Sequence, residues 1–122
     1  MSILAGKSGA DRLEAAYDML RTFPPFKWWK LHEGKEVEFR VTRSVTDMGT
    51  HTTYRHTRDS EHIVEVSERR TAHLLTMLRV LAHEMVHMAQ VIAKSGTSGH
   101  NADFQHRAAK VCAVLGFDPK EF

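Results

Sequence analysis

Cysteine is almost absent from this sequence: Cys112 is the only one in 122 residues. A lone cysteine cannot form an internal disulfide, and it excludes a zinc site built from several cysteines. No apolar run reaches the ~20 residues that a membrane-spanning helix needs. The N-terminus also lacks a basic segment followed by a long apolar stretch, so we predict no secretory signal, no membrane partner and a reducing, cytoplasmic setting.

An excess of charge of one sign is missing as well. Seventeen Lys and Arg against fifteen Asp and Glu give a net charge of +2, too little by itself to indicate nucleic-acid binding. The length predicts a single domain over residues 1–122, and the composition is that of a globular protein. Histidine, in contrast, is abundant. The nine histidines matter because histidine is the commonest metal ligand.

The hydrophobic periodicity changes along the chain from helical to alternating and back to helical. A helix is predicted from a capping-box-like start at 8–11 to a point before Pro24. Alternation and turn residues predict three strands, at 36–41, 50–57 and 63–67. A long helix should run from about 71 to the Ser95-Gly96 pair, and a last one should follow the loop 96–99 and cover 101–115.

These elements predict an α+β fold. It consists of an N-terminal helix, a small three-stranded and mostly antiparallel sheet, a long helix and a C-terminal helix.

The long helix contains an H-E-x-x-H motif formed by His83, Glu84 and His87. Residues i and i+4 are neighbours on one helix face, with Cβ atoms about 5–6 Å apart, so two imidazoles can bind one ion. On a helical wheel both histidines lie opposite an apolar stripe of Leu74, Leu78, Leu81, Met85, Met88 and Ile92. Glu84 lies to one side of the pair, where it could polarise a water molecule on the metal.

A catalytic zinc site needs a third protein ligand and leaves one position for water. Metzincin spacing is excluded, because Gln90 and Ala93 occupy the positions where that class has glycine and histidine. The glycine-bounded loop can bring His100 back to the helix, and His100 is therefore the predicted third ligand. His106 and Asp103 are the alternatives.

The motif together with the segment Gly99-His100-Asn101-Ala102-Asp103-Phe104 resembles the SprT-like metallopeptidases, which include the Spartan proteases. The resemblance covers about residues 60–116. It implies a zincin-like fold, one zinc ion, His100 as third ligand and DNA-associated proteins as substrates. One departure is Asn101 where the family usually has glycine; asparagine also tolerates left-handed backbone angles. Another is the lack of a cysteine-rich zinc module, so the chain resembles the catalytic domain alone.

Further residues are candidates for supporting roles. Tyr54 or His106 could stabilise the oxyanion that forms during peptide hydrolysis. The aromatic and basic cluster of Lys27, Trp28, Trp29 and Lys30 could stack on unpaired bases and bind phosphates, although aromatic side chains in a connector more often close the edge of a core. Phe104 and Cys112 are predicted to be packing residues.

The sequence thus predicts a zinc metallopeptidase that acts on a protein or peptide, with Glu84 as general base. The alternatives are a non-catalytic zinc-containing module that binds DNA or acts as an adaptor, and a regulatory protein with a purely structural zinc ion. The sequence does not indicate an oligomeric state.

Overall fold

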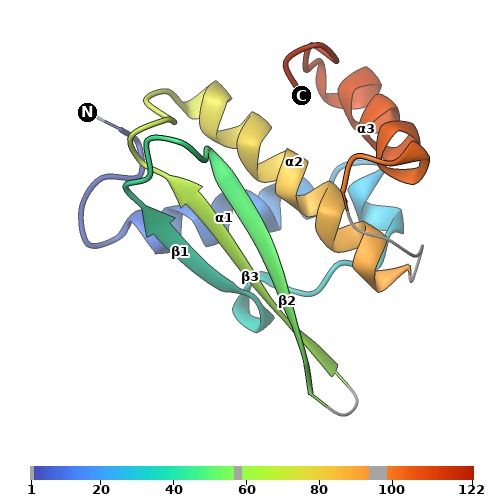
Figure 1. The fold of residues 1–122 in the computed structure, drawn as a ribbon, viewed down its shortest axis with the longest axis horizontal. Coiled ribbons are helices and arrows are strands. Elements are labelled where there is room, and N and C mark those ends of the chain that lie inside the picture. The colour runs from blue at the N-terminus through green and yellow to red at the C-terminus, as the bar shows by residue number, and fades with distance from the viewer. Residues whose placement is uncertain (1, 57–58, 94–98) are drawn as a thin grey trace.

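The computed structural model describes residues 2–56, 59–93 and 99–122, of which 54–56 and 59–60 are described by their backbone alone. These residues form three α-helices, three strands and two short 3-10 helices, which confirms the α+β class (Figure 1). In chain order the elements are α1 (Gly9–Arg21), η1 (Phe26–Trp28), η2 (Gly34–Glu36), β1 (Glu38–Thr42), β2 (Gly49–His56), β3 (Asp59–Ser67), α2 (Leu74–Ile92) and α3 (Ala102–Leu115).

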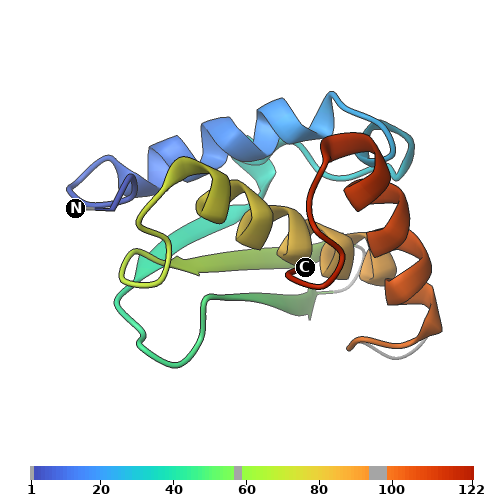
Figure 2. The same ribbon diagram turned by 90° about the horizontal axis from the view of Figure 1, so that it is seen from above.

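The helices and the sheet form two layers. Helices α1 and α2 lie on one face of the sheet, with α1 next to β1 and α2 across β2 and β3 (Figures 1 and 2). Helix α3 packs against α2 at one end of this layer, and the chain after it returns alongside α2. The C-terminal residues therefore lie beside the middle of α2.

The strand order is β1-β3-β2, so β3 is central and β2 lies at an edge of the sheet that the structure describes. Strands β2 and β3 form an antiparallel hairpin, whereas β1 and β3 are parallel. The antiparallel pairing spans eight residue pairs and the parallel one five, so the sheet is mostly antiparallel as predicted, and the parallel pairing of β1 with β3 is the part that the sequence did not predict. The physical reason is that β3 folds back from β2 and takes the place between β2 and β1, where it runs in the direction of β1.

Helix α1 begins and ends where the sequence predicts, but its N-terminus is not capped as expected. It stops at Arg21, ahead of the prolines, and buries Leu13, Tyr17 and Leu20. The predicted capping box is wrong, because the Ser8 side chain makes no capping hydrogen bond and instead accepts one from the Arg12 guanidinium. The side chain of Tyr17 links the layers, because its ring is in edge contact with that of Phe39 in β1, with the centroids 5.2 Å apart; its hydroxyl donates to the His32 carbonyl at 2.6 Å.

The predicted apolar stripe of α2 is buried at its centre, where Leu81, Met85 and Met88 are fully buried, and Leu74 in its first turn is 53% exposed. Apolar residues outside the stripe, such as Met77 and Val86, are buried as well. This is because α2 is covered by the sheet and α1 on one side and by α3 on another. The histidines of α2 consequently lie half-buried among packed elements, which is a drier setting than an open polar stripe.

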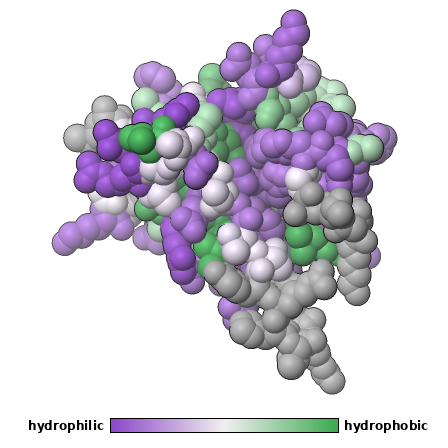
Figure 3. Space-filling model, in the orientation of Figure 1, coloured by the Kyte–Doolittle hydropathy of each residue, from purple (hydrophilic) through white to green (hydrophobic). Residues whose placement is uncertain are grey.

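The sheet face turned away from the helices is largely hydrophilic, and apolar side chains form only small separate patches in this view (Figure 3). Glu38 and Arg40 of β1 are exposed, whereas Phe39 between them is buried. Of the helices in the described residues, none combines the length and the apolar character that spanning a bilayer requires.

Candidate metal centre

His83 and His87 lie one turn apart on α2 and direct their rings toward the same point. Their Nε2 atoms are 3.3 Å apart, and the ring centroids are 5.0 Å apart. Both side chains are half-buried. The two imidazoles therefore form a preorganised pair whose nitrogen atoms converge, as the i, i+4 spacing on a helix allows.

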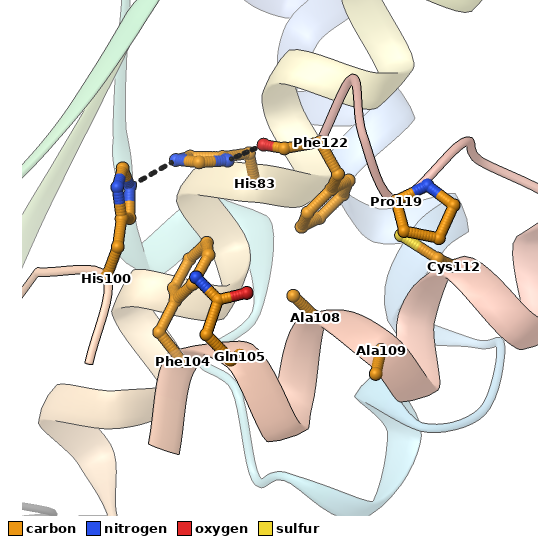
Figure 4. A pocket seen from close by; sticks show the side chains of 9 residues that line it. All are labelled: His83, His100, Phe104, Gln105, Ala108, Ala109, Cys112, Pro119 and Phe122. Carbon is orange, nitrogen blue, oxygen red and sulfur yellow. Dashed lines mark hydrogen bonds between the residues drawn. The ribbon is translucent and has the colours of Figure 1, made fainter. Parts of the chain in front are cut away.

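His100 reaches this pair from the short segment before α3. Its Nε2 atom lies 3.1 Å from the Nε2 atom of His83 (Figure 4). Gly99 immediately before it has a φ of +104°, a conformation that residues with a side chain rarely adopt, and this turn directs His100 back to α2. The predicted loop 96–99 lies mainly outside the described residues. His100 itself lies next to the helical pair, as the sequence predicts.

The three histidines could hold a metal ion, since one nitrogen atom of each lies within 4.8 Å of the others. Ligand nitrogens at 2.0–2.1 Å from a tetrahedral zinc ion would be separated by roughly 3.3–3.4 Å. The distances of 3.3 and 3.1 Å between Nε2 atoms are close to that value. The donor set therefore fits one zinc ion with three nitrogen ligands.

The other ring nitrogens of the helical pair are occupied by hydrogen bonds. The Nδ1 atom of His83 donates to the backbone carbonyl of Phe122 at 2.8 Å (Figure 4), and that of His87 donates to Oε1 of Gln90 at 2.9 Å. Donation from Nδ1 leaves Nε2 as the unprotonated atom in the neutral ring, which is the tautomer that a metal needs. Both hydrogen bonds thus prepare the Nε2 atoms for coordination.

Burial also keeps these rings uncharged. It lowers the pKa of His83 to about 4, despite the opposing effect of the Phe122 carbonyl, and it lowers the pKa of His87 below its usual value. At neutral pH both side chains are therefore neutral, and a metal ion need not displace a proton from them.

Gln90 connects the helical pair with the segment that carries His100. It is buried, with 3% of its surface exposed. In addition to accepting from His87, its side-chain Nε2 donates to the Gly99 carbonyl at 3.3 Å and to Oδ1 of Asn101 at 3.0 Å. Sequence reasoning missed this role. The available signal was a glutamine three residues after His87, on the face of the helix that carries the histidines.

Asn101, the departure from the family pattern, is the N-cap of α3. Its Oδ1 accepts the backbone N–H of Phe104 at 2.9 Å. Phe104 is 3% exposed, and its ring centroid lies between 4.6 and 4.9 Å from those of all three histidines. Phe104 is therefore a packing residue, as predicted, and its ring packs against the rings of all three histidines.

Glu84 lies beside the cluster and is only 6% exposed. Burial raises its pKa to about 7. Gly49, the first residue of β2, lies close to it: a methyl group added there would come within 2.7 Å of Val80 Cγ1, 3.1 Å of the Glu65 carbonyl oxygen and 3.3 Å of Glu84 Oε2. A carboxylate with this pKa can accept and return a proton near neutral pH.

The remaining candidates lie elsewhere. His106 is exposed on α3 and is outside the three-histidine group, and Asp103 forms an ion pair with Arg107 at 2.9 Å. Tyr54 belongs to β2, but its side chain lies outside the described part of the chain. The structure therefore adds no support for Tyr54 or His106 as an oxyanion-stabilising residue.

A second histidine pair lies on the helix-facing side of the sheet, where His62 is buried and His51 is half-buried. Nε2 of His51 and Nδ1 of His62 are 2.8 Å apart, and Nε2 of His62 is buried and has no hydrogen-bond partner among the described residues. Burial, followed by the effect of His62 and then of His87, lowers the pKa of His51 to about 3. These histidines are packing residues, as expected for most histidines outside the motif.

The aromatic and basic cluster separates into two environments. Trp28 is 66% exposed and has the Lys27 amino group 5.4 Å from its ring centroid. Trp29 is half-buried, in edge contact with Phe26 and below the guanidinium of Arg107 at 5.0 Å. Lys30, like Lys27, is exposed. Trp28 thus remains available for stacking, whereas Trp29 closes the edge of the core.

The fold and the site define an α+β chain whose long helix contributes two of three convergent histidines and a buried glutamate. The model of the SprT-like family matches residues 16–121, nearly the whole chain, and the protein belongs to that family. No curated protein and no solved structure matches the chain at a significant level.

Proposed function

We propose that this protein is a zinc-dependent metallopeptidase of the zincin type. The observation that carries the proposal is the convergence of the His83, His87 and His100 Nε2 atoms next to the buried carboxylate of Glu84. A zinc ion bound there would act as a Lewis acid and lower the pKa of a water molecule toward ~7. Membership of the SprT-like family supports the same reading.

Glu84 is the proposed general base and acid. Because burial raises its pKa to about 7, its carboxylate can take the proton of the attacking water and, once protonated, deliver it to the leaving amine.

Strand β2 is the proposed docking edge for the peptide. Within the described sheet, β2 pairs only with β3, so its other edge can accept an extended chain by main-chain hydrogen bonding. Since β2 begins against Glu84, a peptide added to this edge would pass the histidine cluster. Proteins associated with DNA are the substrates that the family relationship suggests.

The test compares the wild type with Glu84→Gln, both loaded with zinc, on an unfolded protein substrate. We expect Glu84→Gln to retain stoichiometric zinc and to lose hydrolysis by 100-fold or more, as loss of a general base entails (on the order of 10²–10⁴-fold). A chelator should abolish cleavage by the wild type, and added zinc should restore it. Cleavage by Glu84→Gln at the wild-type rate would remove Glu84 from the mechanism.

A second candidate function is a non-catalytic zinc-containing module that binds DNA or acts as an adaptor. The exposed Trp28 next to Lys27 is the observation that favours it. This alternative requires salt-sensitive DNA binding that is the same in Glu84→Gln and the wild type, with no cleavage of any protein. A purely structural zinc ion would require four protein ligands, whereas the group in the described residues has three.

A further inference from the structure

Two cavities flank the side chain of His83. The first, here the α3 cavity, has a volume of about 280 Å³ and lies between α3 and the segment after it (Figure 4). The second, here the β2 cavity, has a volume of about 270 Å³ and lies between the start of β2 and residues 121–122. His83 and Phe122 border both cavities, so they form the partition between them.

The two cavities differ in chemistry. Among the described residues, the wall of the α3 cavity contains no Asp, Glu, Lys or Arg; besides His83, His100 and Gln105 it is formed by Phe104, Ala108, Ala109, Cys112, Pro119 and Phe122. Burial raises the pKa of the Cys112 thiol, so that it is neutral near pH 7. In contrast, the β2 cavity is lined by Asp47, Arg79, Glu84 and Glu121. One side of the site is therefore lined mainly by aromatic, alanine and cysteine side chains, and the other carries acidic and basic ones.

Small side chains on α3 create the apolar cavity. Ala108 and Cys112 are one turn apart and Ala109 is adjacent, so this stretch of the helix presents little side-chain volume. Phe104 and Phe122 border the cavity beside His83, with ring centroids 4.9 and 5.4 Å from that of His83, whereas Cys112 and Pro119 lie at the end away from His100 (Figure 4). A cavity of roughly 150 Å³ is enough to hold benzene. The volume of about 280 Å³ therefore accommodates a leucine, methionine or phenylalanine side chain.

We propose that the α3 cavity is a specificity pocket that binds a large apolar side chain of the substrate, next to the peptide bond to be cleaved. This inference rests on the proposed function. The cavity shares His83 and His100 with the cluster, so a peptide whose scissile bond lies at the cluster places a neighbouring residue at the cavity mouth. The charged wall of the β2 cavity offers no equivalent environment on the other side. We therefore expect a preference for a large apolar residue on only one side of the scissile bond.

The test begins with digestion of a mixed peptide library by the zinc-loaded wild-type protein. We expect cleavage sites to be enriched in leucine, methionine or phenylalanine at one position beside the scissile bond, at least tenfold over alanine, because burying such a side chain favours binding by about that factor or more. Cleavage with no such enrichment overturns the pocket and leaves the proposed hydrolysis intact.

Two variants of α3 form a matched pair. Ala109→Phe places a ring at the cavity, whereas Ala113→Phe places the same ring on an exposed residue one turn further along that does not line it. Ala109→Phe should lower kcat/KM for leucine-containing peptides at least tenfold more than for alanine-containing peptides, with unchanged zinc content. Ala113→Phe should behave as the wild type. An unchanged preference in Ala109→Phe overturns the pocket.

Measuring peptide binding in a variant that does not cleave separates the proposed pocket from the proposed hydrolysis. In the zinc-loaded Glu84→Gln background, a leucine-containing peptide should bind at least tenfold more tightly than its alanine counterpart, and adding Ala109→Phe should remove that difference. If the wild type cleaves no peptide but this difference is found, the proposed hydrolysis is wrong and the pocket stands. Equal binding of both peptides overturns the pocket.

Discussion

Gln90 and Asn101 are joined side chain to side chain, with Nε2 of Gln90 donating to Oδ1 of Asn101 at 3.0 Å. The first residue lies on α2 and the second caps α3, next to His100. Because Gln90 also accepts from Nδ1 of His87, one buried amide orients a histidine of the helical pair and fixes the turn that presents the third histidine. The glutamine and the asparagine therefore work as a unit.

Replacing Gln90 with leucine should weaken zinc binding. Leucine has a similar volume but neither accepts from His87 nor donates to Asn101, and loss of such supporting partners typically costs 10–100-fold in metal affinity. We expect a decrease of about that size, measured by competition with a chromophoric chelator. Gln105→Leu on the exposed side of α3 is the matched control and should bind zinc as the wild type does. Unaltered affinity in Gln90→Leu would show that the histidines hold their positions without it.

Gly49→Ala should reduce hydrolysis without reducing zinc affinity. The added methyl group would approach Val80 Cγ1 to 2.7 Å and Glu84 Oε2 to 3.3 Å, so the carboxylate or the strand must shift. A displacement of about 1 Å at a reacting group can cost on the order of 100-fold in rate. We expect a 10- to 100-fold lower kcat on a protein substrate. Thr50→Ala, at the next position of β2, controls for strand propensity; equal activity in the two variants would contradict the contact.

The parts of the site that the sequence predicted are those with a local signal. His83 and His87 have helical spacing, and a helix brings any i, i+4 pair together. The position of His100 followed from a glycine-bounded loop and the resemblance to the family. Gln90 carried a weaker signal, because a polar residue on a helix face is usually solvated, and only its partner across the turn, Asn101, reveals its role.

The fold shows the same division between local and distant information. The alternation of Val37, Phe39 and Val41 predicts a strand, and β1 confirms it. The alternation contains nothing about which strand becomes the neighbour, so the parallel pairing of β1 with β3 could not be predicted from it. Likewise, the capping box was predicted from residue types alone. The Ser8 hydroxyl instead accepts a hydrogen bond from the Arg12 guanidinium, which residue types do not reveal.

Lowering the pH should destabilise the metal-free protein. Burial lowers the pKa of His62 from 6.5 to about 4 and that of His51 to about 3. Between these values and 6.5 the unfolded chain binds more protons than the folded chain, so the free energy of unfolding falls as the pH falls. Burial has the same effect at His83, whereas Glu84, with a pKa raised from 4.5 to about 7, acts in the opposite direction. Three histidines, His51, His62 and His83, act in one direction and Glu84 alone in the other, so acid should lower the free energy of unfolding.

Urea unfolding of the metal-free protein across this pH range measures the slope. His62→Gln should flatten it, by at most about 1.4 kcal/mol per pH unit, the contribution of one proton. A slope that stays the same in His62→Gln would mean that the buried ring titrates as it does in the unfolded chain.

Trp28 should contribute to binding of single-stranded DNA, and Trp29 should not. The Trp28 ring is 66% exposed beside Lys27, so a base can stack on it while the ammonium group contacts a phosphate. Trp28→Ala should weaken binding of a fluorescent oligonucleotide by about tenfold, since stacking contributes about 1–3 kcal/mol per base. Leu75→Ala, at a residue 74% exposed on α2, is the matched control. If no oligonucleotide binding is detected at low or at physiological salt, this surface does not contact DNA. The same conclusion follows if Trp28→Ala and Leu75→Ala bind the oligonucleotide equally.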